Sequence, residues 1–330
     1  MSKTVLLVAD RVENHQEANL QSKDLERLED AYFEKIRAGI LECDCRFRHI
    51  DNPAELIRQA PRLPADTVVF PLWSGVASRS RRALVPSICE AWGVPYVGSD
   101  AYTQVICQDK FVAKRLATRA GLSTPQAVLL TPTDFQERRK VQAALETLAL
   151  PLVVKPNFEG GSIGISQRSL VHSYVDAEST AHEVHSIHRQ PILVEEFAEG
   201  VEASLLLVFA KEEIFLEGVV LYELHEGPCS LEKTIYSLEL KKVSRENISQ
   251  KFSMSSKYPE LFERVYRLVD SLGKVHIIRV DGRMRRGDFQ MIELSPDIYL
   301  GPDSCFEIAA EGCGESYARL ISFLVSTASW

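Results

Sequence analysis

The chain has 330 residues, of which 45% are hydrophobic and 25% are charged, and its formal net charge at pH 7 is −8. This length suits two or three lobes with substantial cores, and the acidic balance excludes a protein that relies on a basic surface to bind nucleic acid. The first apolar run is too short for a signal peptide, and no run of about 18 apolar residues occurs that would span a membrane. Seven cysteines without CxxC spacing indicate reduced thiols. We therefore expect a soluble, cytoplasmic protein with no nucleic-acid or membrane partner.

The first third of the chain alternates short apolar runs with helix-like stretches. Buried strands are predicted at residues 4–9 and 67–73, with a shorter one at 94–100, and helices at 21–41 and 79–92. Such alternation is typical of a parallel sheet, so residues 1–107 are predicted to form an α/β lobe. The arginine-rich run RSRR at 79–82 is interpreted as a solvated helix face.

Residues 109–121, DKFVAKRLATRAG, show the pattern of a helix. Their apolar positions fall on one face, Gly121 suits the C-terminal cap, and Pro125 follows soon after. Lys110 stands in the first turn, where the helix N-terminus already attracts anions. It is a candidate phosphate ligand.

The segment at 153–166, VVKPNFEGGSIGIS, places a lysine ahead of a glycine-rich loop. Lys155 ends the apolar strand 152–155, because Pro156 stops the ladder, and its ammonium is expected to swing freely over the loop. The chain is predicted to return as a strand at 164–169, which makes a flexible flap over phosphates; an ordinary hairpin turn is the alternative. Three glycines allow positive φ and close approach to an anion, and a serine adds a donor: Gly160, Gly161, Gly164 and Ser162, with Glu159 beside them.

Short strands are predicted at 192–196, 203–209 and 215–222, and a helix at 261–272. The stretch ILVEEFAEGVE at 192–202 ends an apolar strand in two glutamates and adds a third, Glu202. Its main chain could contact an adenine edge and Glu202 could bind ribose hydroxyls; a surface strand with acidic ends is the alternative.

Residues 275–295 are predicted to form a β-hairpin with its turn near Arg286. Counting back from that turn places Asp281 opposite Glu293, with Arg279 and Ser295 on the same face. Like charges at such a distance, about 4.5–5.5 Å between Cβ atoms, are destabilising unless something compensates. A bound Mg²⁺ would compensate; the alternative is a salt-bridge ladder in which Arg279 and Arg283 neutralise the two acids.

Taken together, these motifs resemble the ATP-grasp superfamily, and most closely its D-alanine–D-alanine ligase branch. The matching pieces are DK at 109–110, KP with EGGSIG at 155–164, EEFAEGVE at 195–202, RVD at 279–281 and ELSP at 293–296, in family order over residues 94–330. The resemblance implies an α/β ATP-grasp fold with an N-terminal domain at 1–107, a central lid domain at 108–194 and a C-terminal catalytic domain at 195–330.

The same resemblance implies roles for individual residues. Lys110 and Lys155 would hold the α- and β-phosphates, with Ser162 and the lid amides helping. The catalytic residues would be Arg279, at the phosphate and the oxyanion, and Lys233, at the γ-phosphate. The adenine edge would be lined by Glu195, Glu196, Phe197 and Ala198, the ribose by Glu202, and one or two Mg²⁺ ions by Asp281, Glu293 and Ser295.

Two departures from the family pattern affect these implications. Ser295 stands where the family usually has asparagine, which puts the second metal in question; Asp297 is nearby as a substitute. In the first lobe, LWSGVASRSRR at 72–82 replaces a histidine-glycine loop with acidic residues, so that Trp73 takes the place of the histidine and arginines that of the acids. A first substrate with a carboxylate or a bulkier body would suit this pocket better than D-alanine.

The expected activity is therefore a Mg-ATP-dependent carboxylate–amine ligase that joins amino-acid-like substrates through an acyl phosphate and is not a cell-wall D-alanine ligase. A cyclo-ligase that closes one substrate on itself, and a non-catalytic nucleotide-binding relative, are the alternatives. The sequence leaves a homodimer open.

Overall fold

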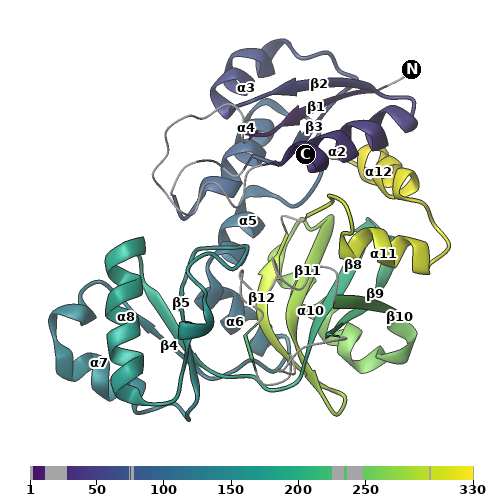
Figure 1. The fold of residues 1–330 in the computed structure, drawn as a ribbon. Helices are drawn as coiled ribbons and strands as arrows, with labels where there is room; N and C mark the ends of the chain where they lie inside the picture. Colours follow the sequence, from purple (N-terminus) through teal and green to yellow (C-terminus); the bar gives the residue numbers. More distant parts are fainter. Residues whose placement is uncertain are drawn as a thin grey trace.

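The computed structural model describes residues 3–11, 28–73, 75, 78–224, 234–235, 248–296 and 299–329. In these ranges three sheets build three lobes, with the first lobe above the other two in Figure 1. None of the described helices combines the length and the apolar character that crossing a membrane requires. The α/β fold expected from the sequence is confirmed.

The first lobe is a parallel sheet in the order β2-β1-β3, which confirms the predicted arrangement. β1 is buried along its whole length, as its unbroken apolar run predicts. The strand predicted at 94–100 is wrong: Tyr96 makes only isolated bridges with Val69 and Ser329 there. The elements of this lobe are β1 (Thr4–Val8), α2 (Asp30–Glu42), β2 (Arg46–Ile50), α3 (Pro53–Gln59), β3 (Thr67–Pro71), the 3₁₀ turn η3 (Arg81–Ala83) and α4 (Leu84–Trp92).

Two helices, α5 (Ala101–Gln108) and α6 (Lys110–Arg119), follow the first lobe. α6 confirms the predicted helix, and Asp109 caps it by accepting a hydrogen bond from the Val112 N–H at 3.1 Å. α5 begins in the same way, because the Asp100 carboxylate accepts from the Thr103 N–H at 2.7 Å. In Figure 1 α5 lies in the middle of the molecule, between the first lobe and the hairpin of β11 (Ile277–Arg285) and β12 (Asp288–Ser295).

The second lobe is an antiparallel sheet in the order β4-β7-β5-β6, covered on one side by α7 and α8. The predicted return strand at 164–169 is wrong. Ser166 caps the 3₁₀ turn η5 (Gln167–Ser169) with a reciprocal capping box, and pairing with β5 begins only at β6. The elements are β4 (Ala127–Leu130), α7 (Arg138–Leu145), β5 (Leu152–Pro156), β6 (Leu170–Val171), α8 (Tyr174–His188) and β7 (Ile192–Glu196).

The third lobe is a five-stranded antiparallel sheet in the order β10-β9-β8-β11-β12. The hairpin register confirms the prediction, since Asp281 pairs with Glu293 and Arg279 with Ser295. The predicted strands at 203–209 and 215–222 and the helix at 261–272 are confirmed within longer elements. These are β8 (Val201–Ala210), β9 (Glu213–Leu224), β10 (Ile248–Met254), α10 (Pro259–Leu272), β11 (Ile277–Arg285), β12 (Asp288–Ser295), α11 (Cys305–Gly312) and α12 (Tyr317–Ser326).

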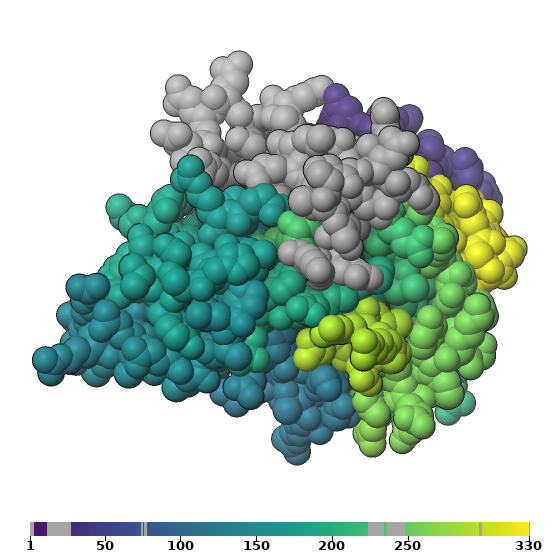
Figure 2. Space-filling view, turned by 60° about the horizontal axis from the view of Figure 1, so that its bottom comes forward, coloured from purple at the N-terminus to yellow at the C-terminus, as the bar shows by residue number. Residues whose placement is uncertain are grey.

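The end of the chain joins the third lobe to the first. Ile36 and Ile40 of α2 share one hydrophobic core with Leu320 and Leu324 of α12, and this core also includes residues of β8 and β9. Figure 2 shows the second lobe, in teal, beside the third, in green, on one face of the molecule. The domain boundaries at 107 and 194 stay a prediction; residue 194 itself lies inside β7.

Candidate functional site

A cavity of about 1370 Å³ lies where the three lobes meet. Its wall includes the ends of α5 and α6, the loop after β5, the segment after β7 and the hairpin β11–β12. Fourteen of the residues predicted to act in catalysis, ATP binding or metal binding line it: Lys110, Lys155, Glu159, Gly160, Gly161, Ser162, Glu195, Phe197, Ala198, Glu202, Arg279, Asp281, Glu293 and Ser295. Gly164 and Glu196 lie outside the lining, and Lys233 and Asp297 fall outside the described residues.

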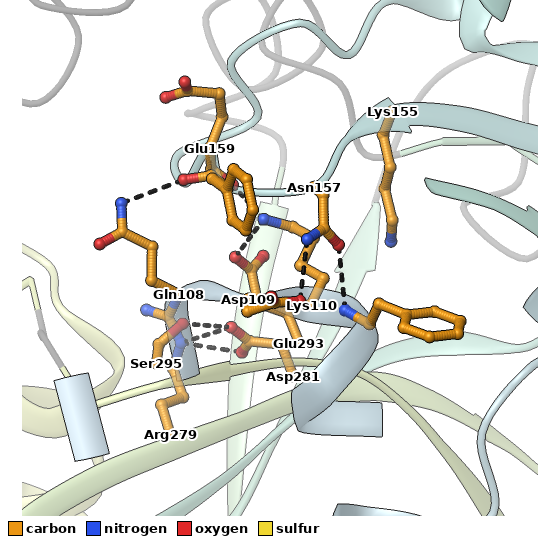
Figure 3. Close-up of polar contacts among 12 residues, drawn as sticks. Gln108, Asp109, Lys110, Lys155, Asn157, Glu159, Arg279, Asp281, Glu293 and Ser295 are labelled. Atoms are coloured by element: carbon orange, nitrogen blue, oxygen red, sulfur yellow. Dashed lines mark hydrogen bonds and ion pairs between the residues drawn. The ribbon is translucent and has the colours of Figure 1, made fainter. Parts of the chain in front are cut away.

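The two carboxylates of the hairpin each contact a cation. The Arg279 guanidinium lies 2.8 Å from Asp281, which also accepts from the Ser204 hydroxyl at 2.6 Å. Glu293 lies 3.0 Å from the Lys110 ammonium (Figure 3). Burial acts to raise the pKa of Glu293, but Lys110 and its neighbouring cations outweigh burial and hold that pKa below its usual range. Glu293 is therefore a carboxylate at neutral pH.

The salt-bridge ladder considered from the sequence is present only in part. Arg279 does pair with Asp281. Arg283 does not pair with either acid of the hairpin, because its buried guanidinium contacts the segment that follows β7. There it lies 2.7 Å from Glu202, donates to the Ala198 carbonyl oxygen at 3.1 Å and stacks over the Phe197 ring. Arg283 thus contacts three of the residues that were predicted to line adenine and ribose.

A buried charge cluster lies behind the phosphate-binding lysines. Glu195 contacts Lys155 through one carboxylate oxygen and Lys114 through the other, at 2.7 Å, and all three side chains are almost fully buried. Burial lowers the pKa of Lys114 to about 8, although Glu195 opposes the shift. Burial also acts to raise the pKa of Glu195, but Lys114 and Lys155 together keep it below its ordinary value. The expectation that Lys155 swings freely at a strand end is therefore wrong, since a neighbouring strand brings Glu195 against it.

Lys114 was not singled out from the sequence, although a signal was present. It stands four residues after Lys110 in DKFVAK, so both lysines lie on one face of α6. Glu196 points the other way from Glu195, because side chains alternate along a strand. Its carboxylate accepts from the Ala149 N–H at 2.8 Å.

The glycine-rich loop after β5 is tied to the first lobe. The Arg81 guanidinium lies 3.2 Å from the Glu159 carboxylate, and the Gln190 amide donates to the other oxygen of Glu159 at 2.8 Å. Lys110 donates to the main-chain oxygen of Glu159. Arg81 is only 6% exposed, so the prediction that the run at 79–82 is a solvated face is wrong for this residue. Gly164 is required here, because its φ is +73° and a Cβ would lie 2.5 Å from Pro156.

The donor set of the hairpin fits a magnesium ion that is shared with phosphates. Among the described residues, no group of three or more His, Cys, Asp and Glu side chains could bind a metal by itself. Mg²⁺, however, is commonly bound by one or two carboxylates together with phosphate oxygens and water. Asp281 and Glu293 supply two such carboxylates opposite each other, with the Ser295 hydroxyl 3.4 Å from Asp281. Buried lysines on the same cavity wall supply the positive charge that phosphates require.

Three lobes around a cleft that combines lysines, a glycine-rich loop and paired carboxylates define an ATP-grasp enzyme. A family model described as D-ala D-ala ligase C-terminus matches residues 116–326. An uncharacterized protein of Sinorhizobium fredii, y4sG, is 27% identical over 266 residues, which cover 79% of this chain and 74% of the relative. The D-alanine–D-alanine ligase of Methylibium petroleiphilum is 36% identical over 120 residues, 36% of each chain.

Solved structures agree on the fold. The D-alanine–D-alanine ligase of Bacillus anthracis superposes with a TM-score of 0.71 over 99% of this chain and 97% of its own, at 17% identity. Its structure complexed with ATP gives a TM-score of 0.69 at the same identity and coverage. The chain belongs to the D-alanine–D-alanine ligase family of the ATP-grasp superfamily. It is an ATP-dependent, carbon–nitrogen bond-forming ligase that uses ATP and Mg²⁺ and acts on small amino-acid-like molecules.

Proposed function

We propose that this protein joins the carboxylate of one amino-acid-like substrate to the amine of another, and that D-alanine is not its first substrate. The observation that carries the proposal is that one continuous cavity of about 1370 Å³ connects the phosphate-binding lysines and the paired carboxylates to the first lobe. An ATP site alone would need no such extension. The part of the cavity lined by the first lobe is therefore the proposed binding site for the amino-acid-like substrates.

In the proposed reaction, an oxygen of the substrate carboxylate bonds to the γ-phosphorus while the bond to ADP breaks, giving an acyl phosphate. The amine nitrogen of the second substrate then bonds to the acyl carbon, loses a proton, and phosphate leaves. Lys110 and Lys155 hold phosphate charge, and Arg279 stabilises the negative oxygen that develops on the acyl carbon. Asp281 and Glu293 would hold Mg²⁺, which when bound would supply charge neutralisation and alignment for the phosphoryl transfer.

The first-lobe end of the cavity supports a substrate other than D-alanine. Its lining includes Pro71, Leu72, Trp73 and Arg82, together with Glu29. An indole and a guanidinium suit a bulkier molecule, or one with a second anionic group, better than a methyl side chain. The homodimer and the cytoplasmic location expected from the sequence stay predictions.

The test is phosphate release by the purified protein with Mg-ATP against pools of D- and L-amino acids, with D-alanine alone as a separate sample and mass spectrometry of each product. A product lighter than its two substrates by one water is expected. A dehydrated single substrate would instead support the cyclo-ligase. If none of the pools gives phosphate release, the ligase proposal is refuted. Efficient use of D-alanine as first substrate would refute the exclusion of that amino acid.

A matched pair of variants tests the role of Arg279. Arg279→Ala is expected to lower turnover by about 100-fold or more while ATP still binds. Arg285→Ala is the control, because Arg285 is on the same strand but pairs with Glu199 at the exposed end of the hairpin. Equal turnover in the two variants would contradict the role given to Arg279.

A further inference from the structure

Two glutamines of α5 face the cavity from a position that the proposed chemistry does not use. Gln104 and Gln108 are four residues apart and so share one face of the helix. They are only 6% and 9% exposed, and both line the cavity. Neither side-chain carbonyl oxygen has a hydrogen-bond partner within the described parts of the chain. The cavity wall therefore contains two buried acceptors on adjacent turns.

The orientation of one of these amides is fixed by its other end. The Gln108 amide nitrogen donates to the Phe158 carbonyl oxygen at 3.1 Å, which leaves the Gln108 oxygen as the open acceptor. Figure 3 shows this amide turned toward the loop that carries Glu159, with its oxygen directed away from Lys110. The Gln108 acceptor thus lies beside the phosphate-binding groups but does not point at Lys110.

A buried acceptor without a partner loses its hydration and gains nothing in return. The Gln108 amide nitrogen has a structural role in its bond to Phe158, but the Gln108 oxygen takes no part in that bond. At Gln104, leucine or methionine would fill the same volume without the penalty of an unpaired acceptor. A ligand that donates two hydrogen bonds would remove the penalty. The unpaired oxygens are thus best explained as half of a recognition site.

The side-chain type indicates which donors fit. A carbonyl oxygen accepts from N–H or O–H groups, whereas a buried ammonium or guanidinium needs a carboxylate beside it to offset its desolvation. Gln104 and Gln108 are neutral. They suit an uncharged donor such as a carboxamide or a hydroxyl.

We propose that Gln104 and Gln108 select a first substrate that carries an uncharged N–H or O–H donor on the part that lies against α5. This inference rests on the proposed ligase function and adds the chemical class of the carboxylate substrate. A site built to hydrogen-bond a substrate group rejects analogues that lack the group far more strongly than an apolar pocket rejects an extra methylene.

The test compares two sets of carboxylate substrates in the phosphate-release assay. One set carries neutral donors (serine, threonine, asparagine and glutamine, each in D and L form). The other holds apolar analogues of similar size (alanine, valine, leucine and methionine). We expect kcat/KM to favour the best donor-bearing substrate by at least about 100-fold over its apolar analogue. Gln104→Met and Gln108→Met should each reduce this ratio about tenfold or more. Gln104→Met should also leave the KM for ATP unchanged, whereas Gln108→Met additionally loses the hydrogen bond to Phe158 of the glycine-rich loop.

Gln142→Met is the control, because Gln142 donates to Glu178 on the outer helices of the second lobe, away from the cavity. It should keep the wild-type ratio. The melting temperature separates recognition from a structural role: without substrate, Gln104→Met should unfold at the same temperature as wild type or higher, since it removes an unpaired acceptor.

Each outcome decides the question. A ratio near one in the wild type, an unchanged ratio in both cavity variants, or a clear drop in the melting temperature of Gln104→Met would overturn this inference and leave the ligase proposal standing. Absence of turnover with every substrate would overturn the ligase proposal and this inference with it.

Discussion

Replacing Glu195 by glutamine should destabilise the protein and weaken ATP binding, because it leaves two buried ammonium groups without their shared partner. Glu195 lies 2.7 Å from Lys114 and also contacts Lys155. At an effective dielectric constant near 20, one such contact is worth roughly 6 kcal/mol before desolvation is subtracted. Breaking a buried pair from one side typically costs about 3–5 kcal/mol. We expect a loss of about 3 kcal/mol at pH 7.

We expect the lower end of the range of about 3–5 kcal/mol because Lys114 can lose its proton when Glu195 is replaced. Burial already lowers its pKa to about 8, so at pH 7 the variant can release this proton for at most about 1.4 kcal/mol. The unfolded chain binds the same proton more tightly, and stability therefore rises with pH between the folded and the unfolded pKa. In the wild type, this rise in stability begins near pH 8. In Glu195→Gln the pKa of Lys114 is lower, so the rise begins at lower pH. The difference in stability between wild type and variant should therefore shrink from pH 6 to pH 8.

Denaturant unfolding of both proteins at pH 6, 7 and 8 would measure this difference, and calorimetry would follow ATP binding. Glu196→Gln is the matched control, because its carboxylate points away from the lysines to the Ala149 N–H. It should cost about 1 kcal/mol at every pH. A loss below about 1 kcal/mol for Glu195→Gln, or one that is the same at pH 6 and pH 8, would refute the reasoning.

Three further substitutions test other contacts of the site. Arg81→Met should raise the KM for ATP about tenfold, equivalent to about 1.4 kcal/mol, because the glycine-rich loop loses its ion pair between Arg81 and Glu159. Arg81→Lys should recover part of this loss. An unchanged KM in Arg81→Met would show that the ion pair does not support ATP binding. Glu293→Gln should raise the Mg²⁺ concentration for half-maximal activity at least about tenfold in a magnesium titration, and an unshifted curve would remove Glu293 from the metal site. Gly282→Ala should lower the free energy of unfolding by about 1–3 kcal/mol in denaturant melts, because its Cβ would lie 2.2 Å from a main-chain oxygen of β12. An unchanged free energy of unfolding would show that the bulge beside Asp281 can relax.

The sequence predicted best where the evidence was local. The pairing of Asp281 with Glu293 depends only on strand alternation and a short turn, and both are readable from adjacent residues. The fate of Arg81 was not readable, because its partner Glu159 is 78 positions away and only the tertiary fold brings the two together. The same holds for Lys155, whose partner Glu195 comes from a neighbouring strand of the sheet. A basic run is therefore a weak guide to exposure when an acidic loop elsewhere in the chain can bury part of it.

The pairing of cations with acids also limits what single variants can reveal. Lys110 lies against Glu293, and Arg279 against Asp281, so these two cations each have a proposed metal ligand as their partner, whereas Lys155 pairs with Glu195. Removing the acid weakens the metal site and also leaves the cation without its partner. A change in activity or stability of a single variant therefore mixes the loss of the metal ligand with the cost of the unpaired cation. Their contributions separate only in a double-mutant cycle, because the coupling energy isolates the pair from each residue's own role. A cycle of Lys110→Met with Glu293→Gln, measured by denaturant unfolding and by turnover, should show strong coupling in unfolding and weaker coupling in turnover. The reason is that during turnover the two side chains bind phosphate and metal rather than each other, and equal coupling in the two measurements would contradict this.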